Sequence, residues 1–224
     1  IIPYLFNQNS LKKISGIKYF LGIKYFITKY LNKLKKKIIS KKMNILFTSG
    51  GSDTENSTLK FLKLFKFINS KSIKLFILLG PNFQKLNIKK IKNICIKEKF
   101  NVKFLEFKKN IYSNIFDKDL VITSSGLTKY DLLQFKKPFV VFSENNNQKK
   151  INERFKFLFY RLYFDDLSYC KKNLTRLNKI INNKRYINSY NDKVNNIKMN
   201  DFKTIYNFIK KWFLKKINWQ PLFL

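Results

Sequence analysis

Apolar residues along the chain form short unbroken runs that alternate with segments of helical spacing. The runs predict strands that are buried on both faces, and most of them end at a glycine or a polar turn. The segments between them carry apolar residues three and four positions apart, which predicts helices. The expected strands are 44–48, 73–79, 102–107, 120–123 and 139–142, and the expected helices are 58–68, 88–100, 111–116, 127–135 and 148–163.

Strands that alternate with helices in this way predict an α/β fold, a Rossmann-like parallel sheet with helices on both faces. Ligands of such sheets bind beyond the carboxyl ends of the strands, so the loops that follow the strands are the expected site. Four of these loops carry distinctive glycine or polar residues: 49–53, 80–82, 124–128 and 144–148.

The first loop runs from Ser49 to Asp53 and includes Gly50 and Gly51. Glycines let the backbone approach a phosphate closely, but a tight turn with Asp53 as a helix cap explains the same residues equally well. The loop lacks the third glycine of a dinucleotide-binding fingerprint and the Gly-Lys-Ser/Thr of a P-loop. Those two cofactor classes therefore lose support.

The loop after the fourth strand, Ser125 to Thr128, opens a predicted helix whose first turn also holds Asp131. Amides at a helix N-terminus attract phosphate, and a carboxylate one turn on can accept hydrogen bonds from two ribose hydroxyls. The alternative is that Thr128 and Asp131 only stabilise the start of the helix.

The chain has 47 Lys and Arg residues against 13 Asp and Glu residues, a formal net charge of +34. Such a charge ordinarily indicates nucleic acid or an anionic membrane as the partner. The lysines are nevertheless spread through every segment and accompany many Asn, Ile and Phe residues, as in products of genes rich in A and T. We interpret the charge mainly as compositional and expect no specific nucleic acid partner; peripheral contact with an acidic membrane stays an alternative.

Several residue types and segments limit the possible chemistry. Histidine is absent, so a general base has to be a carboxylate, a hydroxyl or an amine. Cys95 and Cys170 have no neighbours at metal-ligand spacing, so we expect incidental thiols and no metal site. No apolar run reaches the roughly 18 residues of a membrane span, and no secretory signal is recognisable, which favours a cytoplasmic location.

Four motifs occur in the order found in the C-terminal domain of GT-B enzymes, and residues 43–163 resemble that domain. The resemblance is greatest to glycosyltransferases of spore-coat polysaccharide synthesis and to the UDP-sugar hydrolase of pseudaminic acid synthesis. A more distant similarity runs to the N-acetylglucosaminyltransferase of peptidoglycan synthesis. The motifs are Ile45 to Asp53 with Asn56, Thr58 and Leu59; Gly80 to Phe83; Asp119 to Asp131; and Pro138 with Asn147 and Gln148.

The resemblance implies a site for a nucleotide-sugar, most simply a UDP-sugar, without a metal or another cofactor. It implies that the Gly51 loop and the amides of residues 125–128 hold the diphosphate, that Asp131 holds the ribose, and that Gln148 with Asn147 reaches the sugar. The complete set of expected site residues is Gly50, Gly51, Ser52, Asp53, Gly80, Pro81, Asn82, Ser125, Gly126, Leu127, Thr128, Asp131, Asn147 and Gln148.

Two positions depart from the family pattern. The family usually has Glu where Asp131 stands, so the carboxylate reaches less far towards a ribose. It also has a small-residue turn where residues 134–137 precede Pro138, which puts the helix packing there in question.

The resemblance also divides the chain. Residues 1–42 match a remnant of the N-terminal domain and the crossing segment, 43–185 the Rossmann-like domain, and 186–224 a helical tail with an apolar-aromatic helix at 202–213. Most of an N-terminal domain is missing, so we expect a fragment whose partner is a separate N-terminal domain or an acceptor-binding protein. The catalytic residues stay unassigned.

Two functions are left open by the sequence. The first is an enzyme of surface polysaccharide biosynthesis that transfers sugar from a nucleotide-sugar or hydrolyses it. The alternative is a non-catalytic basic module that binds polyanions or an acidic membrane, whose affinity would fall steeply with salt.

Overall fold

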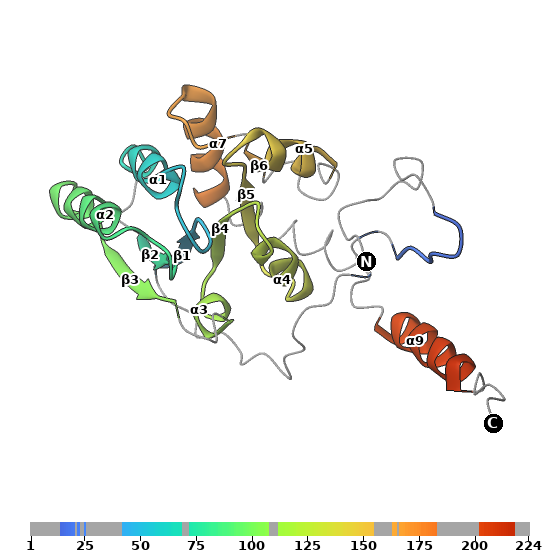
Figure 1. Cartoon of the computed structure of the whole chain (residues 1–224). Helices are drawn as coiled ribbons and strands as arrows, with labels where there is room; N and C mark the ends of the chain where they lie inside the picture. The colour runs from blue at the N-terminus through green and yellow to red at the C-terminus, as the bar shows by residue number, and fades with distance from the viewer. Residues whose placement is uncertain are drawn as a thin grey trace. The chain divides into compact units, whose positions relative to one another are not determined.

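The computed structural model describes residues 14–20, 22, 25, 42–68, 72–107, 112–154, 163–164, 166–182 and 202–217. The chain divides into two compact units, one formed by Ile1–Lys29 with Ile197–Leu224 and the other by Tyr30–Asn196. The second unit contains the sheet and is the larger (Figure 1).

The sheet consists of six parallel strands in the order β3-β2-β1-β4-β5-β6. All five strands expected from the sequence are present, and their ends differ from expectation by at most one residue. The strands are β1 (Met43–Thr48), β2 (Ile73–Leu79), β3 (Val102–Glu106), β4 (Leu120–Ser124), β5 (Phe139–Phe142) and β6 (Tyr163–Phe164).

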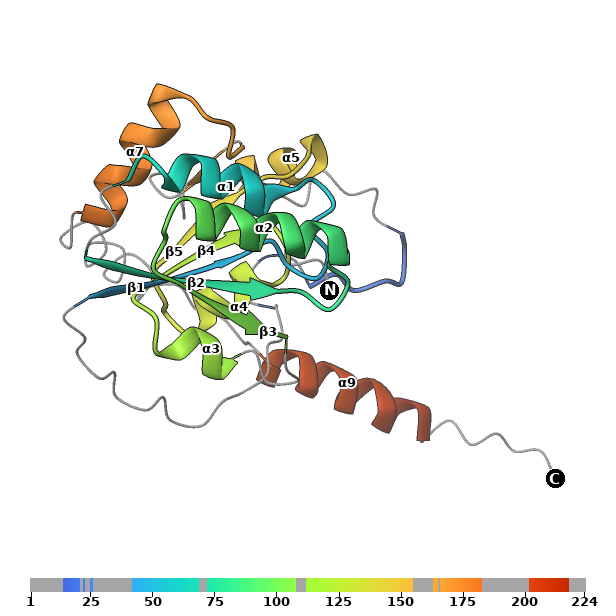
Figure 2. The same ribbon diagram turned by 90° about the vertical axis from the view of Figure 1, so that its left-hand side faces the viewer.

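Helices cover both faces of the sheet, which confirms the expected fold class. Figure 2 shows α1, α2 and α7 on one face and α3 and α4 on the other. The helices of this unit are α1 (Ser57–Phe65), α2 (Lys85–Lys97), α3 (Tyr112–Phe116), α4 (Thr128–Gln134), α5 (Asn146–Arg154) and α7 (Lys171–Asn182). No helix in the described residues is long and apolar enough to cross a membrane.

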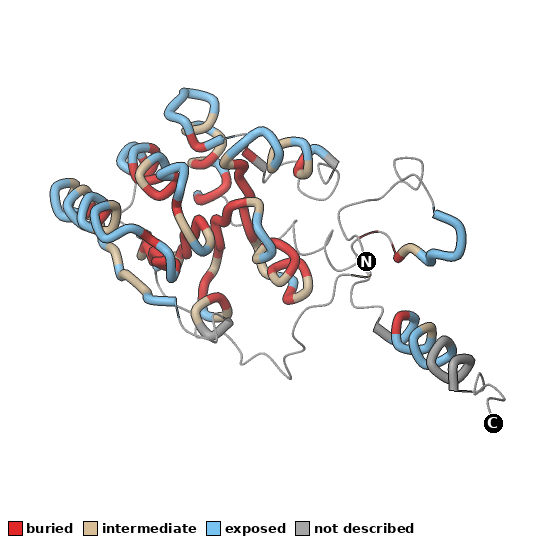
Figure 3. The backbone as a smooth tube through the Cα atoms, viewed as in Figure 1, coloured by how far each residue is buried: buried red, intermediate tan, exposed pale blue. Residues whose placement is uncertain are grey.

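The core lies between the central strands and the helices, where the strands are buried almost throughout (Figure 3). Phe47 of β1 stacks on Phe61 of α1 with a centroid distance of 4.3 Å and on Phe142 of β5 at 5.6 Å. The unbroken apolar runs of the sequence therefore have their physical origin in strands enclosed on both faces.

One expectation from the sequence was wrong at the end of the fifth helical segment. The sequence predicted a helix up to Tyr163, whereas Tyr163 and Phe164 form β6, which pairs with Val141 and Phe142 of β5. The amide of Ser143 also donates a hydrogen bond to the carbonyl oxygen of Phe164 at 3.1 Å. Partners so distant in sequence stabilise a strand that local apolar spacing does not distinguish from a helix.

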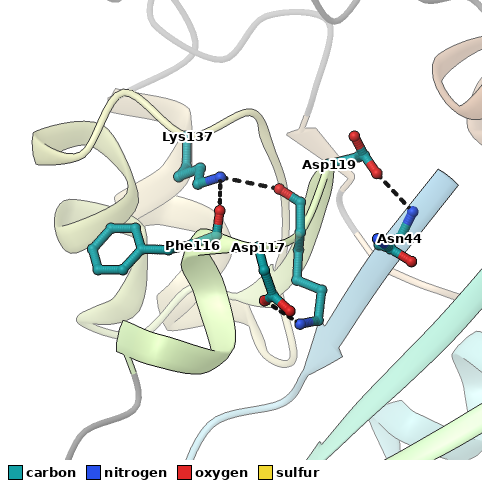
Figure 4. A network of polar contacts seen from close by, with 6 residues as sticks. Asn44, Phe116, Asp117, Asp119 and Lys137 are labelled. Atoms are coloured by element: carbon teal, nitrogen blue, oxygen red, sulfur yellow. Dashed lines mark hydrogen bonds and ion pairs between the residues drawn. The ribbon is translucent and has the colours of Figure 1, made fainter. Parts of the chain in front are cut away.

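Residues 134–137, where the family has small residues, comprise the end of α4 and a turn that contains Lys136 and Lys137. Lys136 has a φ of 52°, in the left-handed region that glycine usually occupies after a helix. The Lys137 ammonium donates hydrogen bonds to the carbonyl oxygens of Phe116, at 2.5 Å, and Lys118, at 3.1 Å (Figure 4). Lys137 thus binds carbonyl groups at the carboxyl end of α3. This contact attaches the turn to that helix without the small residues of the family.

The smaller unit joins the opening segment to the C-terminal helix α9 (Phe202–Ile217). The ring of Phe20 lies 5.2 Å from that of Tyr25 and 5.3 Å from that of Phe208, each edge to face. Ile205 is buried in the same unit. The helix expected at 202–213 is present, and the domain boundaries expected from the resemblance stay a prediction.

Candidate functional site

β1 and β4 lie side by side at the centre of the sheet, and the order in which the chain adds strands reverses between them. The chain leaves β1 towards β2 on one side and leaves β4 towards β5 on the other, so β1 and β4 flank the switch point of the sheet. Parallel sheets bind their ligands at such a switch point. Four of the six glycines of the chain, Gly50, Gly51, Gly80 and Gly126, follow β1, β2 and β4.

Gly80 joins the loop after β2 to the loop after β1. A Cβ atom at Gly80 would lie 2.3 Å from the carbonyl oxygen of Gly50 and 2.4 Å from that of Gly51. The amide of Asn82 donates a hydrogen bond to the carbonyl oxygen of Gly51 at 2.9 Å. The two backbones touch here, and glycine is the residue that permits this approach. Pro81 and Asn82 are exposed.

Gly50 brings the loop after β1 next to the end of β4. Its φ of 89° lies in the region that favours glycine, and a Cβ atom there would lie 3.5 Å from the hydroxyl oxygen of Ser124. The loops that the sequence predicted to form one site, after β1, β2 and β4, are therefore neighbours in the structure.

Gly51 and Gly126 differ from the other two glycines of these loops. Neither has a φ in the left-handed region, and a Cβ atom on either would meet nothing within 4 Å. Both residues are exposed. The chain itself thus gives no steric or backbone reason for glycine at either position.

Asp53 performs the capping role that the sequence offered as one of its two interpretations. Its carboxylate oxygens accept hydrogen bonds from the amide of Thr58 at 3.2 and 3.3 Å, and the residue is 4% exposed. The adjacent Ser52 is half-buried. A carboxylate therefore already occupies an amide in the first turn of α1, which makes that helix end less attractive to a phosphate.

The Gln148 side chain forms hydrogen bonds with Glu144, a residue outside the expected site residues. The Gln148 side chain accepts a hydrogen bond from the Glu144 amide at 2.9 Å and donates one to the Glu144 carboxylate at 3.2 Å. The same carboxylate accepts a hydrogen bond from the Ser57 hydroxyl at 2.9 Å, which links the loop after β5 to the start of α1. Asn147 is exposed beside it.

Burial raises the pKa of the Glu144 carboxyl above its usual value. The hydrogen bonds from Ser57 and Gln148 oppose this rise, and the nearby carboxylates of Asp53 and Glu55 add to it. Three acidic side chains, Glu144, Asp53 and Glu55, thus lie near one another on the α1 side of the candidate site.

A buried polar network supports the opposite side of the site. The Lys129 ammonium, in a residue that is 1% exposed, donates hydrogen bonds to the carbonyl oxygen of Ser125 at 3.3 Å, to its hydroxyl oxygen at 2.9 Å and to Asn152 Oδ1 at 3.1 Å. Asn152 is fully buried and donates to the Ser143 hydroxyl at 3.0 Å. The network joins the loops after β4 and β5 to α4 and α5.

The burial of Lys129 is predictable from the sequence, although the residue lies outside the expected site residues. Leu132 and Leu133 follow Lys129 by three and four positions, about one helical turn, and all three are buried. The lysine therefore shares the inward face of α4. A lysine on such a face indicates a buried charge with specific partners. Asn152 carries no comparable signal, because its neighbours in the sequence, apart from Ile151, are polar.

The remaining expected residues lie at the start of α4. Leu127 is 70% exposed, Thr128 is half-buried, and Asp131 is a half-buried residue in the first turn of the helix. In the described part of the chain, no three Cys, Asp or Glu residues are placed to hold a metal ion.

Comparison with solved structures identifies the fold. MurG of Acinetobacter baumannii superimposes with a TM-score of 0.58 at 14% identity, over 79% of this chain and 54% of that one. The GT-B-type fold is thereby established. The spinosyn rhamnosyltransferase SpnG matches with a TM-score of 0.52 at 10% identity, over 83% of this chain and 50% of that one. A mutant of TarM from S. aureus matches with a TM-score of 0.50 at 12% identity, over 75% of this chain and 35% of that one.

The sequence comparisons add one relative. An uncharacterized protein of Methanocaldococcus jannaschii is 31% identical over 140 residues, which are 59% of this chain and 28% of that protein. No protein-family model matches the chain. The GT-B-type chain thus spans about a quarter of this relative and about half or less of the three solved structures.

Proposed function

We propose that the sheet domain is the nucleotide-sugar-binding half of a glycosyltransferase of surface polysaccharide biosynthesis, with a UDP-sugar as donor. The observation that carries the proposal is the open space in front of Gly51 and Gly126. Glycine at those positions lets a ligand come as close as the backbone itself.

The glycine usage of the whole chain strengthens this argument. The chain has only 6 glycines, and lysine stands even at positions 99 and 136, where a φ of 51° and 52° favours glycine. Glycine stands at positive φ at Gly16, Gly22 and Gly50, but it is also kept at Gly51 and Gly126, where the backbone does not require it. A bound ligand explains this pattern.

Charge favours a particular placement of the diphosphate. The α1 side carries the carboxylate of Asp53 and the half-buried carboxyl of Glu144, whereas the loop after β4 contacts the Lys129 ammonium. We therefore place the diphosphate between Gly51 and the amides of residues 125–128, with Asp131 at the ribose and Gln148 and Asn147 towards the sugar.

In this arrangement the backbone amides would stabilise the charge that develops on the UDP leaving group as the sugar is transferred. The resemblance of the motifs to those of GT-B enzymes supports UDP as the nucleotide and surface polysaccharide biosynthesis as the pathway. An acceptor-binding half, supplied by a separate N-terminal domain or protein, would complete the enzyme, because the chain spans 54% of the MurG structure.

Calorimetric titration of the chain with UDP, at low and at high salt, tests the proposal. We expect micromolar binding that survives high salt, whereas a non-nucleotide polyanion such as heparin should bind in a salt-sensitive way. Binding of the polyanion alone, lost in salt, would contradict the proposal and support the basic-module alternative.

A pair of variants locates the binding. Asp131→Ala should weaken UDP at least about tenfold, which is ~1.4 kcal/mol, because the ribose loses its acceptor. Asp117→Ala is the matched control, since Asp117 is an exposed carboxylate at the opposite end of the sheet. Equal affinity of the two variants would remove Asp131 from the site.

A further inference from the structure

The buried ammonium of Lys129 lies directly behind the turn that begins α4. Its three protons have three neutral oxygen acceptors: the carbonyl and the hydroxyl of Ser125, and Oδ1 of Asn152. An ammonium donates three hydrogen bonds, whereas a neutral amine donates two. The geometry of the network therefore suits the charged form of the side chain.

The contact with the Ser125 carbonyl fixes how the next amide points. In a trans peptide the C=O and the following N–H point in opposite directions, and the structure has no cis peptide bond in its described residues. Because the Ser125 carbonyl faces the buried ammonium, the N–H of Gly126 faces away from it. A Cβ atom on Gly126 would meet only open space, so nothing in the described part of the chain crowds this exposed residue.

We propose that Lys129 is a positioning residue of the nucleotide-sugar site, whose buried ammonium orients the Ser125–Gly126 peptide towards the diphosphate and takes up a proton when the diphosphate binds. The inference rests on the proposed function, because it assumes an anionic ligand in front of this turn. The negative charge of the diphosphate would attract the buried ammonium behind the turn.

The proton uptake follows from the environment of the amine. Burial lowers the pKa of Lys129 to about 8, so part of the population is neutral in the absence of a ligand at slightly alkaline pH. An anion close to the ammonium raises that pKa again, and binding is then coupled to protonation. Other titratable side chains on the elements packed around it are Tyr130 and Asp131 on α4, Glu144 next to Ser143, and Lys149, Lys150 and Glu153 on α5.

The test is calorimetry of UDP binding to the full chain at pH 8 in two buffers of different ionisation enthalpy. Wild-type protein should take up roughly half a proton on binding, because a group with a pKa of about 8 is half deprotonated there. Its affinity should be about tenfold weaker at pH 9 than at pH 7. UDP itself contributes little near pH 8, since a phosphate monoester has its second pKa near 6.

Three variants separate this role from a structural one. Lys129→Met should abolish the proton uptake and weaken binding at pH 7. Lys129→Arg should retain binding and make it independent of pH, because arginine stays charged. Lys137→Met is the matched control, since Lys137 also donates to two backbone carbonyls but at the opposite end of the sheet, and its uptake should equal that of the wild type.

The possible outcomes are distinct. UDP binding by the wild type without proton uptake, or with the same uptake in Lys129→Met, would overturn the inference and leave the proposed function standing. Absence of UDP binding by the wild type at every pH would overturn both. If Lys129→Met fails to fold, the comparison of Lys129→Arg with the wild type decides: the same proton uptake in both would overturn the inference.

Discussion

The backbone of Gly80 touches that of Gly51: a Cβ atom on Gly80 would lie 2.4 Å from the carbonyl oxygen of Gly51. This contact holds the loop after β2 against the loop after β1. It also distinguishes a glycine that the fold requires from one that it does not, since a Cβ atom on Gly51 would meet nothing within 4 Å.

Gly80→Ala should therefore destabilise the domain by about 1–3 kcal/mol, because a methyl group would push two backbones apart. Urea unfolding followed by circular dichroism measures the loss. Gly51→Ala is the matched control and should change the free energy of unfolding by less than about 0.5 kcal/mol. Equal stability of the two variants would show that the loops do not touch as described.

Lys136→Gly should stabilise the protein by about 1 kcal/mol, because glycine adopts a left-handed φ without the steric cost that a side chain meets. The wild-type lysine has a φ of 52° after α4. Lys90→Gly in the exposed interior of α2 should have the opposite effect and cost about 1 kcal/mol. Thermal unfolding of both variants checks the signs; a loss of stability in Lys136→Gly would contradict the turn.

Because of Lys129, the free energy of unfolding should increase as the pH rises into the alkaline range. Burial lowers its pKa from 10.5 to about 8, so the unfolded chain binds more protons than the folded one between these values. Stability then rises with pH through this window, by up to about 3 kcal/mol. Denaturant unfolding between pH 7.5 and 10.5 should show a smaller rise in Lys129→Met, and identical rises in both proteins would refute the buried ammonium.

The two cysteines should differ sharply in reactivity. Cys95 is 2% exposed, and burial raises its pKa to about 11, so almost none of the reactive thiolate is present near neutral pH. Cys170 is exposed. A thiol reagent at pH 7.5 should label one cysteine rapidly in the native protein and both in denaturant, and Cys170→Ser should remove the rapid phase. Rapid labelling of Cys95 in the native protein would contradict its burial.

The sequence predicted the sheet well because its central strands are buried on both faces. Residues 73–79, for example, are apolar at all but one position and end at Gly80, and a short apolar run with such an ending is typical of a buried strand. The edge strand β6 escaped prediction, since two aromatic residues become a strand only through pairing with β5.

The candidate site was predictable as a set of loops but not as a set of contacts. Gly51 and Gly126 are recognisable in the sequence, whereas the hydrogen bonds of Glu144 to Ser57 and Gln148 join residues up to 87 positions apart. Whether Asp53 caps a helix or faces a ligand was likewise undecided until the Thr58 amide was seen beside it. Such choices depend on three-dimensional neighbours rather than on residue type.

Hydrogen–deuterium exchange of the chain with and without UDP tests the location of the site most directly. We expect UDP to protect the amides of residues 49–53 and 125–131, while residues 116–119 at the opposite end of the sheet exchange as before (Figure 4). Unchanged exchange at both loops under saturating UDP, or protection confined to the opposite end, would contradict a nucleotide-sugar site at the switch point of the sheet.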